Sequence, residues 1–168
     1  MLRTLIPTLT AVAFSAFAAL AQDLPQPEGE VLLTVSGAIS TTNNGSTAEF
    51  DLDMLKALDD TTIETTTIWT EGTQVFQGVS LNVLMTRLGI DGGTLRATAI
   101  NDYAVEIPVS DATPEGPILA YLLNGDTMSI RDKGPLWVIY PYDANSDYRS
   151  EVIYSRSIWQ LDRIEAID

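Results

Sequence analysis

The chain has 168 residues, with 9 Lys and Arg against 23 Asp and Glu, a net charge of −14, and neither Cys nor His. A chain this negative repels nucleic acid and anionic lipid, so partners of those two classes are not expected. Without Cys and His there is no disulfide, no Ser-His-Asp or Cys-His nucleophile, and no metal centre ligated by Cys or His. Catalysis would have to use carboxylates, Tyr, Lys or a cofactor.

The N-terminal residues predict a secretory signal peptide over residues 1–21. A basic start at Arg3 precedes an apolar run over 5–20, and Ala19-x-Ala21 fits the small-x-small cleavage rule. A membrane anchor is the alternative, but a proline and several hydroxyl residues interrupt the run, which is short for a span. Cleavage leaves 147 residues and, because Arg3 is lost, a charge of −15. We therefore expect a periplasmic or secreted protein without a membrane span.

The next part of the chain predicts short elements in alternation. Residues 22–30 hold two prolines and a glycine, which indicates an extended leader before a single domain over 31–168. An apolar, β-branched run predicts a strand over 31–36. Asp51 is a suitable N-cap for a short amphipathic helix that contains Leu55 and Leu58.

A second helix is predicted from apolar residues at helical spacing. A strand rich in Thr and Ile comes first, over residues 63–69. Leu81, Leu84, Met85 and Leu88 then share one helix face. Ser80 is the expected N-cap of this helix, and Gly89 supplies its left-handed end.

The second half of the chain is mostly strand. Alternating or apolar runs predict strands over 94–100 and 103–107, a strand or helix over 118–123, and a hairpin of 127–130 with 136–140. The spacing of apolar residues over 157–167 is helical in part but also fits a strand, and we favour the strand. Strands with two or three short helices indicate an α+β domain built on a mixed β-sheet.

A charged turn stands out because the chain has few cations. Arg131 and Lys133 precede the apolar run 136–140, which predicts a central strand covered on both faces. Gly134 would let the backbone approach a ligand closely. With Arg149, which follows the same strand, these cations predict one positive pocket for a small anionic or polar ligand. The alternative is a solvated hairpin turn whose cations pair with nearby acids.

An acidic turn follows the same apolar run. Asp143-x-Asn145-x-Asp147 resembles the first half of a calcium loop, but that motif requires Gly and Glu where this chain has Tyr148 and Tyr154. We interpret it as an acidic surface turn and assign no metal ligand. The spacing of the 23 acids also singles out no carboxylate pair for glycoside hydrolysis.

Four stretches, taken in order and spacing, resemble the sulfite-oxidase-type molybdopterin-binding domain. They are VFQGVSLNVLMTRLGI (75–90), TAINDYAVEIPVSD (98–111), LLNGDTMSIRDKGPLWVIYPYD (122–143) and SRSIWQLDRIEAI (155–167). The resemblance covers about Val31 to Ala166 and implies a mixed α+β fold around a pterin groove. In that family a Cys thiolate upstream of the first of these stretches holds molybdenum, whereas residues 61–81 here contain no Cys.

The resemblance also implies where the groove lies. It places the turn Asp102-Tyr103 at the groove edge, opposite the cations. Trp69 has loop-like neighbours, and we place it near the groove, although all three Trp residues are core candidates first. The expected ligand-binding residues are therefore Trp69, Asp102, Tyr103, Arg131, Lys133 and Arg149.

These observations predict an exported, non-catalytic binding or sensory accessory protein. We expect no cofactor, and as partner either a small anionic or polar ligand or a periplasmic or membrane sensor protein. One alternative is a molybdopterin-dependent oxidoreductase that binds its cofactor without a protein thiolate. Another is a structural domain without a ligand.

Overall fold

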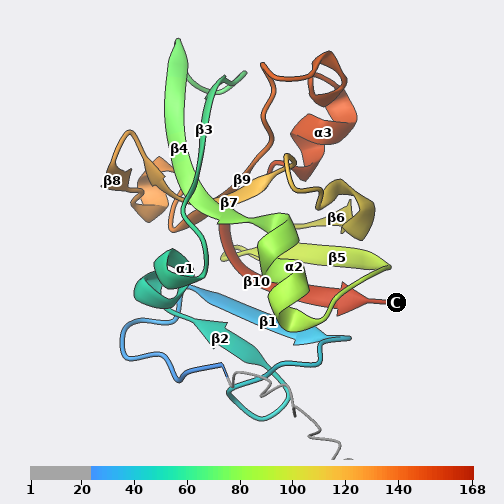
Figure 1. Cartoon of the computed structure of the whole chain (residues 1–168). Helices are drawn as coiled ribbons and strands as arrows, with labels where there is room; N and C mark the ends of the chain where they lie inside the picture. Colours follow the sequence, from blue (N-terminus) through green and yellow to red (C-terminus); the bar gives the residue numbers. More distant parts are fainter. Residues whose placement is uncertain (1–23) are drawn as a thin grey trace, which may run out of the picture.

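A mixed sheet of ten strands forms the body of the protein in the computed structural model, which describes residues 24–168 (Figure 1). The strands are β1 (Leu33–Gly37), β2 (Ala48–Phe50), β3 (Thr61–Thr66), β4 (Thr73–Ser80), β5 (Thr94–Ala99), β6 (Ala104–Pro108), β7 (Ile118–Leu123), β8 (Asp126–Thr127), β9 (Leu136–Ile139) and β10 (Trp159–Ile167). The main order is β2-β1-β10-β9-β7-β4-β3, while β5 pairs with β10 and β6, and β8 with β7. Among the described strands only β1 and β10 run parallel.

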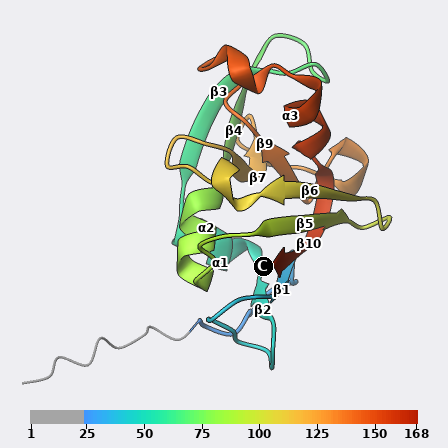
Figure 2. The same cartoon turned by 90° about the vertical axis from the view of Figure 1, so that its right-hand side faces the viewer.

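Three short helices and three 3₁₀ turns complete the fold. They are α1 (Leu52–Leu58), α2 (Leu81–Leu88) and α3 (Glu151–Arg156), with 3₁₀ turns at Val109–Asp111, Ile130–Asp132 and Ser146–Tyr148. Figures 1 and 2 show α3 at the same end of the molecule as the β3–β4 hairpin, far from β1 and β2. The expected α+β fold with a mixed sheet is confirmed.

The helix ends confirm two predicted caps and correct a third. The Asp51 carboxylate accepts a hydrogen bond from the Met54 amide at 2.8 Å, as predicted. Gly89 ends α2 in the left-handed region, at φ 72°. Ser80, however, makes no side-chain cap. It is the last residue of β4, and its own amide donates to the Asp59 carboxylate at 2.7 Å.

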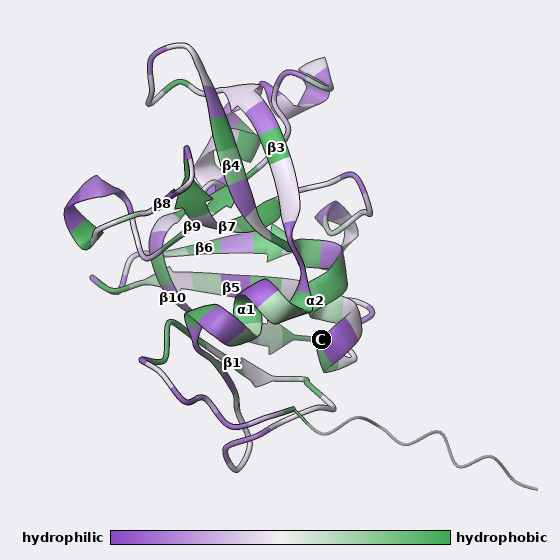
Figure 3. Cartoon of the chain, turned by 60° about the vertical axis from the view of Figure 1, so that its left-hand side comes forward, coloured by the Kyte–Doolittle hydropathy of each residue, from purple (hydrophilic) through white to green (hydrophobic). Residues whose placement is uncertain are grey.

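The core lies along the middle of the sheet. All four residues of β9 are buried, and this strand lies between β7 and β10, as predicted for the apolar run after Gly134. Residues 118–123 form a strand rather than a helix. Figure 3 shows that hydrophilic and hydrophobic residues alternate along α1, whereas α2 is largely hydrophobic.

The predicted hairpin of 127–130 with 136–140 is wrong. Strand β8 has two residues and pairs with β7, and β9 pairs with β7 and β10. The reason is a closed loop between them: the amides of Asp132 and Gly134 both donate to the Ser129 carbonyl, at 2.9 and 2.7 Å. These bonds fold residues 129–134 back on themselves, so they cannot pair as a strand.

The N-terminal part of the described chain has no regular structure but is tied to the domain. Residues 24–30 form neither helix nor strand, and the Asn43 side chain donates to the Pro25 carbonyl at 2.6 Å. The predicted signal peptide over 1–21 lies outside the described residues. Across residues 24–168, none of the helices has the length and apolarity needed to cross a membrane.

Candidate functional site

A cavity of about 370 Å³ is walled by aromatic side chains from four separate elements, and we call it the aromatic groove. The β3–β4 loop supplies Trp69, the β5–β6 turn supplies Tyr103, α3 supplies Tyr154, and β10 supplies Trp159. The remaining lining residues are Ala99, Asn101, Ser155, Ser157, Ile158 and Gln160. The groove therefore joins segments that are far apart in the sequence.

Trp69 is the centre of an aromatic cluster behind this groove. Its ring packs edge-to-face on Trp137 and Trp159, both at 5.7 Å between centroids, on Tyr154 at 5.8 Å and on Tyr142 at 6.3 Å. Each such pair adds stabilisation beyond the apolar area that it buries. Four such contacts hold the Trp69 ring in place, so the back wall of the groove is preformed.

A buried chain of hydrogen bonds through Ser157 fixes the Trp137 and Tyr142 rings that pack against Trp69. The Trp137 indole N–H donates to the Ser157 carbonyl at 3.1 Å, and the Tyr142 hydroxyl donates to Ser157 Oγ at 2.6 Å. Ser157 Oγ in turn donates to the Ile153 carbonyl at 2.9 Å. Burial raises the pKa of Tyr142 to about 12, so the phenol stays protonated and remains a donor at neutral pH.

Lys133 is held beside the groove by the closed loop. Its backbone is left-handed, at φ 76°, and its carbonyl accepts from the Gln160 amide at 3.0 Å. Its ammonium lies 4.2 Å from the Trp159 ring centroid and 5.4 Å from that of Trp137. No carboxylate of the described residues forms an ion pair with it.

Gly134 is required next to Lys133. A Cβ at this position would lie 1.8 Å from the Met128 carbonyl oxygen, which is backbone and cannot rotate away. Glycine thus allows the loop to close tightly enough to bring the ammonium over the indole rings.

The structure brings three of the six predicted site residues together. Trp69 and Tyr103 line the aromatic groove, and Lys133 lies beside it. Asp102, Arg131 and Arg149 do not line it. Their role in binding stays a prediction, but the expected single pocket of three cations is corrected.

Local pairing explains this correction. Arg149 donates to the Asp143 carboxylate at 2.6 Å and to the Tyr142 carbonyl at 2.8 Å. Asp102 forms an ion pair with Arg163 at the exposed β5–β6 turn. Arg131 is exposed in a 3₁₀ turn.

The acidic turn after β9 has a structural role. The Thr66 amide and hydroxyl, together with Arg149, hold the pKa of Asp143 below its usual range. The Asn145 side chain accepts from the Asp147 amide at 3.0 Å and caps the following 3₁₀ turn. Over residues 24–168 no group of three or more acidic, His or Cys side chains could hold a metal ion.

Sequence reasoning missed Tyr154 and Trp159 as groove residues. Tyr154 lies on α3, which was not predicted, although Ser150 was available as its N-cap and accepts from the Ile153 amide at 3.4 Å. The helix has six residues with one buried, so it carries no clear helical period.

A molybdopterin cofactor does not fit the donors present. Molybdenum in the resembling family needs a soft thiolate, and this chain has neither Cys nor His. The groove is instead walled by aromatic rings, with a lysine at its edge. No reaction step is therefore assigned to that cofactor.

Comparison with known proteins shows the fold. No family model matches the chain, and no curated protein matches its sequence. Among solved structures it is similar to the sulfane dehydrogenase SoxCD from Paracoccus pantotrophus, with a TM-score of 0.58 and 18% identity over 81% of this chain. The match covers 38% of the SoxCD chain. The mixed sheet with few short helices thus resembles the fold of part of that dehydrogenase, and membership in the sulfite-oxidase-type family stays a prediction.

Proposed function

We propose that this protein is a non-catalytic binding protein whose ligand site is the aromatic groove. The observation that carries the proposal is the Lys133 ammonium, which is fixed over two indole rings and has no carboxylate partner. What distinguishes Lys133 from Lys56 and Arg131, which also form no ion pair with a carboxylate of the described residues, is that its ammonium lies over two indole rings at the edge of a cavity. The cations that do form ion pairs with carboxylates of the described residues are Arg96, Arg149, Arg156 and Arg163.

The lining defines the chemistry of the ligand. Aromatic faces favour a ring or another planar group, and the ammonium attracts a negative group. Asn101 and Tyr103 can supply hydrogen bonds at the open side. A volume of about 370 Å³ lies in the range of small-molecule sites. The ligand proposed is therefore a small planar anion, such as an aromatic carboxylate.

The cellular role follows from the predicted signal peptide. An exported binding protein with neither a His-activated nucleophile nor a Cys thiolate suits an accessory role, in which ligand binding is detected by a periplasmic or membrane sensor protein. The alternative is an oxidoreductase that binds molybdopterin without a thiolate; the fold likeness to SoxCD motivates this alternative, whereas the absence of Cys and His argues against it. Native mass spectrometry of protein purified from its own host separates the two, because a bound cofactor with one molybdenum per chain would overturn the binding proposal.

A matched pair of probes tests the site directly. Benzoate and its uncharged amide, benzamide, present the same ring with and without the negative charge. We expect benzoate to bind more tightly than benzamide in isothermal titration calorimetry. Lys133→Met should lower the affinity for benzoate about fivefold and leave the affinity for benzamide unchanged. Trp69→Ala should weaken both probes.

Lys56→Met is the matched control. Lys56 lies exposed in the last turn of α1 and does not line the groove. The control should leave both probes unaffected. Equal binding of benzoate and benzamide, or equal losses in the two lysine variants, would contradict the assignment of Lys133.

A further inference from the structure

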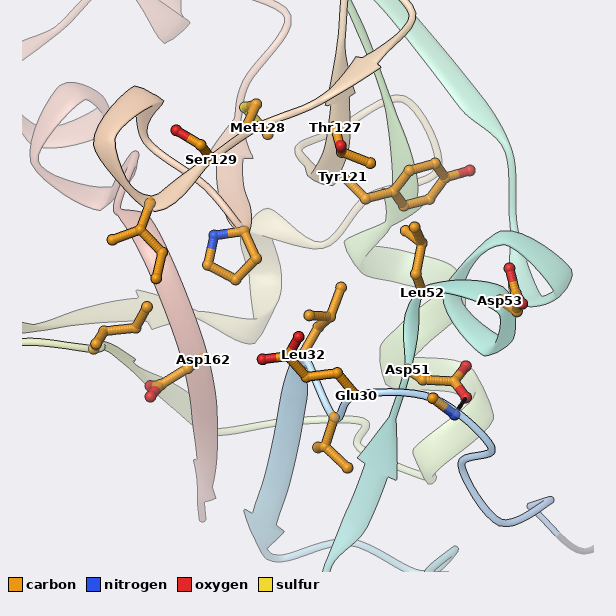
Figure 4. A pocket seen from close by; sticks show the side chains of 15 residues that line it. Glu30, Leu32, Asp51, Leu52, Asp53, Tyr121, Thr127, Met128, Ser129 and Asp162 are labelled. Carbon is orange, nitrogen blue, oxygen red and sulfur yellow. Dashed lines mark hydrogen bonds between the residues drawn. The ribbon is translucent and has the colours of Figure 1, made fainter.

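A second and larger cavity, of about 650 Å³, opens on another side of the 99–103 turn. Ala99 and Asn101 line the aromatic groove, whereas Ile100, between them, lines this cavity. Its other walls come from the segment before β1, the start of α1, the loop after β8, and β10. In Figure 4 the Glu30 side chain points into its middle, between β10, which carries Asp162, and the start of α1.

The charged side chains that line this cavity are all acidic, and we call it the acidic groove. They are Glu30, Asp51, Asp53 and Asp162, and no Lys or Arg is among the described residues that line it. Glu30 and Asp53 form no hydrogen bond or ion pair through their carboxylates, so their charges face solvent uncompensated. Asp51 accepts three backbone N–H bonds, which hold its pKa below the usual range and keep it ionised.

Exposed apolar residues gather at the same groove. Seven large hydrophobic side chains of the described chain are exposed, and three of them line the acidic groove: Val31 at 41%, Ile100 at 42% and Ile130 at 57%. They come from three segments distant in sequence. Leu32, Leu52 and Pro135 add apolar surface to the same cavity. Apolar side chains that converge on a cavity within a charged surface are typical of an interaction site.

We propose that the acidic groove is a docking site for a basic, apolar segment of a partner protein. Two of the four carboxylates, Glu30 and Asp53, have no cationic partner among the described residues and are complementary to Lys or Arg side chains. Asp162 is ion-paired with Arg163, and the buried Asp51 carboxylate is bonded to backbone amides, so these two add only negative potential. The three exposed apolar residues match Leu, Val or Phe side chains between the cations of the partner. A segment that carries both cationic and apolar side chains would pair with the carboxylates and cover the apolar residues, whereas a simple cation would leave the apolar surface exposed. A second copy of the chain is disfavoured, since its net charge of −14 would be repelled.

The proposal does not depend on the ligand of the aromatic groove. None of the residues that line the acidic groove lines the aromatic one. The proposal for either groove can therefore be refuted while the proposal for the other stands.

Three amidated decapeptides serve as probes in calorimetry: alternating Lys and Leu, alternating Glu and Leu, and alternating Lys and Ser. The proposal expects binding of the Lys–Leu peptide alone, weakened by added salt because the groove charges are partly exposed. Backbone NMR shifts should then change at Val31, Ile100 and Ile130. The double variant Glu30→Gln, Asp53→Asn should weaken this binding about tenfold.

A charge-matched control distinguishes docking from general attraction to an acidic protein. The double variant Glu64→Gln, Asp91→Asn removes the same charge from exposed positions outside the groove and should leave the affinity unchanged. Ile130→Ser should lower the affinity for the Lys–Leu peptide severalfold, while Lys133→Met should leave that affinity unchanged.

Several results would overturn the proposal. These are equal binding of the Lys–Ser peptide, equal losses in both double variants, shifts at residues outside the groove, or no binding by any probe. Sedimentation of the protein alone as a dimer that Ile130→Ser dissociates would assign the groove to self-association instead. Circular dichroism of each variant shows that a lost affinity is not a lost fold.

Discussion

The carboxylate of Asp51 connects the N-terminal residues to the domain, and its removal gives a prediction with a defined magnitude. Asp51 is 5% exposed. It accepts from the Met54 amide at 2.8 Å and from the amides of Glu28 and Gly29, both at 2.8 Å. Asp51→Ala removes a helix cap, which costs about 1–2 kcal/mol, and two leader bonds worth about 0.5–1.5 kcal/mol each. We expect the free energy of unfolding to fall by about 2–5 kcal/mol.

The cost of this substitution depends on pH. The N–H donors lower the folded pKa of Asp51 from its ordinary value of 3.8, so its stabilisation is fully present above about pH 4. It is lost as the pH falls through the lowered pKa, where the carboxylate becomes protonated in the folded state. Urea denaturation at pH 7 and at pH 3 should therefore show a smaller difference between wild type and Asp51→Ala at the lower pH.

Asp53→Ala is the control, because Asp53 lies in the same first turn but is exposed and makes no cap. It should cost about 0.3–1 kcal/mol through the helix dipole alone. Hydrogen exchange should also show that the amides of Glu28 and Gly29 lose protection in Asp51→Ala only. If the two variants were equally stable at pH 7, the hydrogen bonds at Asp51 would not stabilise the fold as argued.

Two further predictions concern the loop and the buried chain beside the aromatic groove. Gly134→Ala should lower the free energy of unfolding by about 1–3 kcal/mol, because its Cβ meets the Met128 backbone, whereas Gly92→Ala, with open space around it, should not destabilise; thermal unfolding compares the two. Tyr142→Phe should cost about 1 kcal/mol at pH 7 by removing its bond to Ser157. Because its folded pKa is raised to about 12, wild-type stability should decline as the pH rises above the unfolded value of 10.0, and urea denaturation between pH 9 and 11 should show a shallower decline in Tyr142→Phe.

Much of the fold follows from local patterns in the sequence. Helix α2 has four apolar residues on one face and a glycine stop, and β9 reads as a fully buried strand; both lie as predicted. Strand β4 was missed because Gly78 interrupts it. The structure shows why glycine is there: a Cβ would lie 2.2 Å from the Leu119 carbonyl oxygen, where β4 shifts register against β7. A residue that weakens a strand pattern thus marks the close approach of two strands.

The candidate site was harder to predict, because its composition depends on long-range pairing. Arg163 and Asp102 are 61 residues apart, and Asp111 and Arg156 are 45 apart. A sequence shows that such charges exist but not which ones neutralise each other. Trp69 and Tyr103 could be placed at the groove, whereas Tyr154 could not, because α3 has too few buried residues to show a helical period.

The charged turn before β9 is neither a hairpin nor a pocket of three cations, and its geometry explains both errors. The Ser129 carbonyl closes residues 129–134 into one loop, and Gln160 fixes that loop to β10 through the carbonyls of Ile130 and Lys133. The loop therefore presents different side chains to different surfaces. Ile130 reaches the acidic groove while Lys133 lies over Trp159 at the aromatic groove. Side chains three residues apart in one tight turn thus belong to two sites, a division that strand alternation does not predict because the turn has no strand geometry.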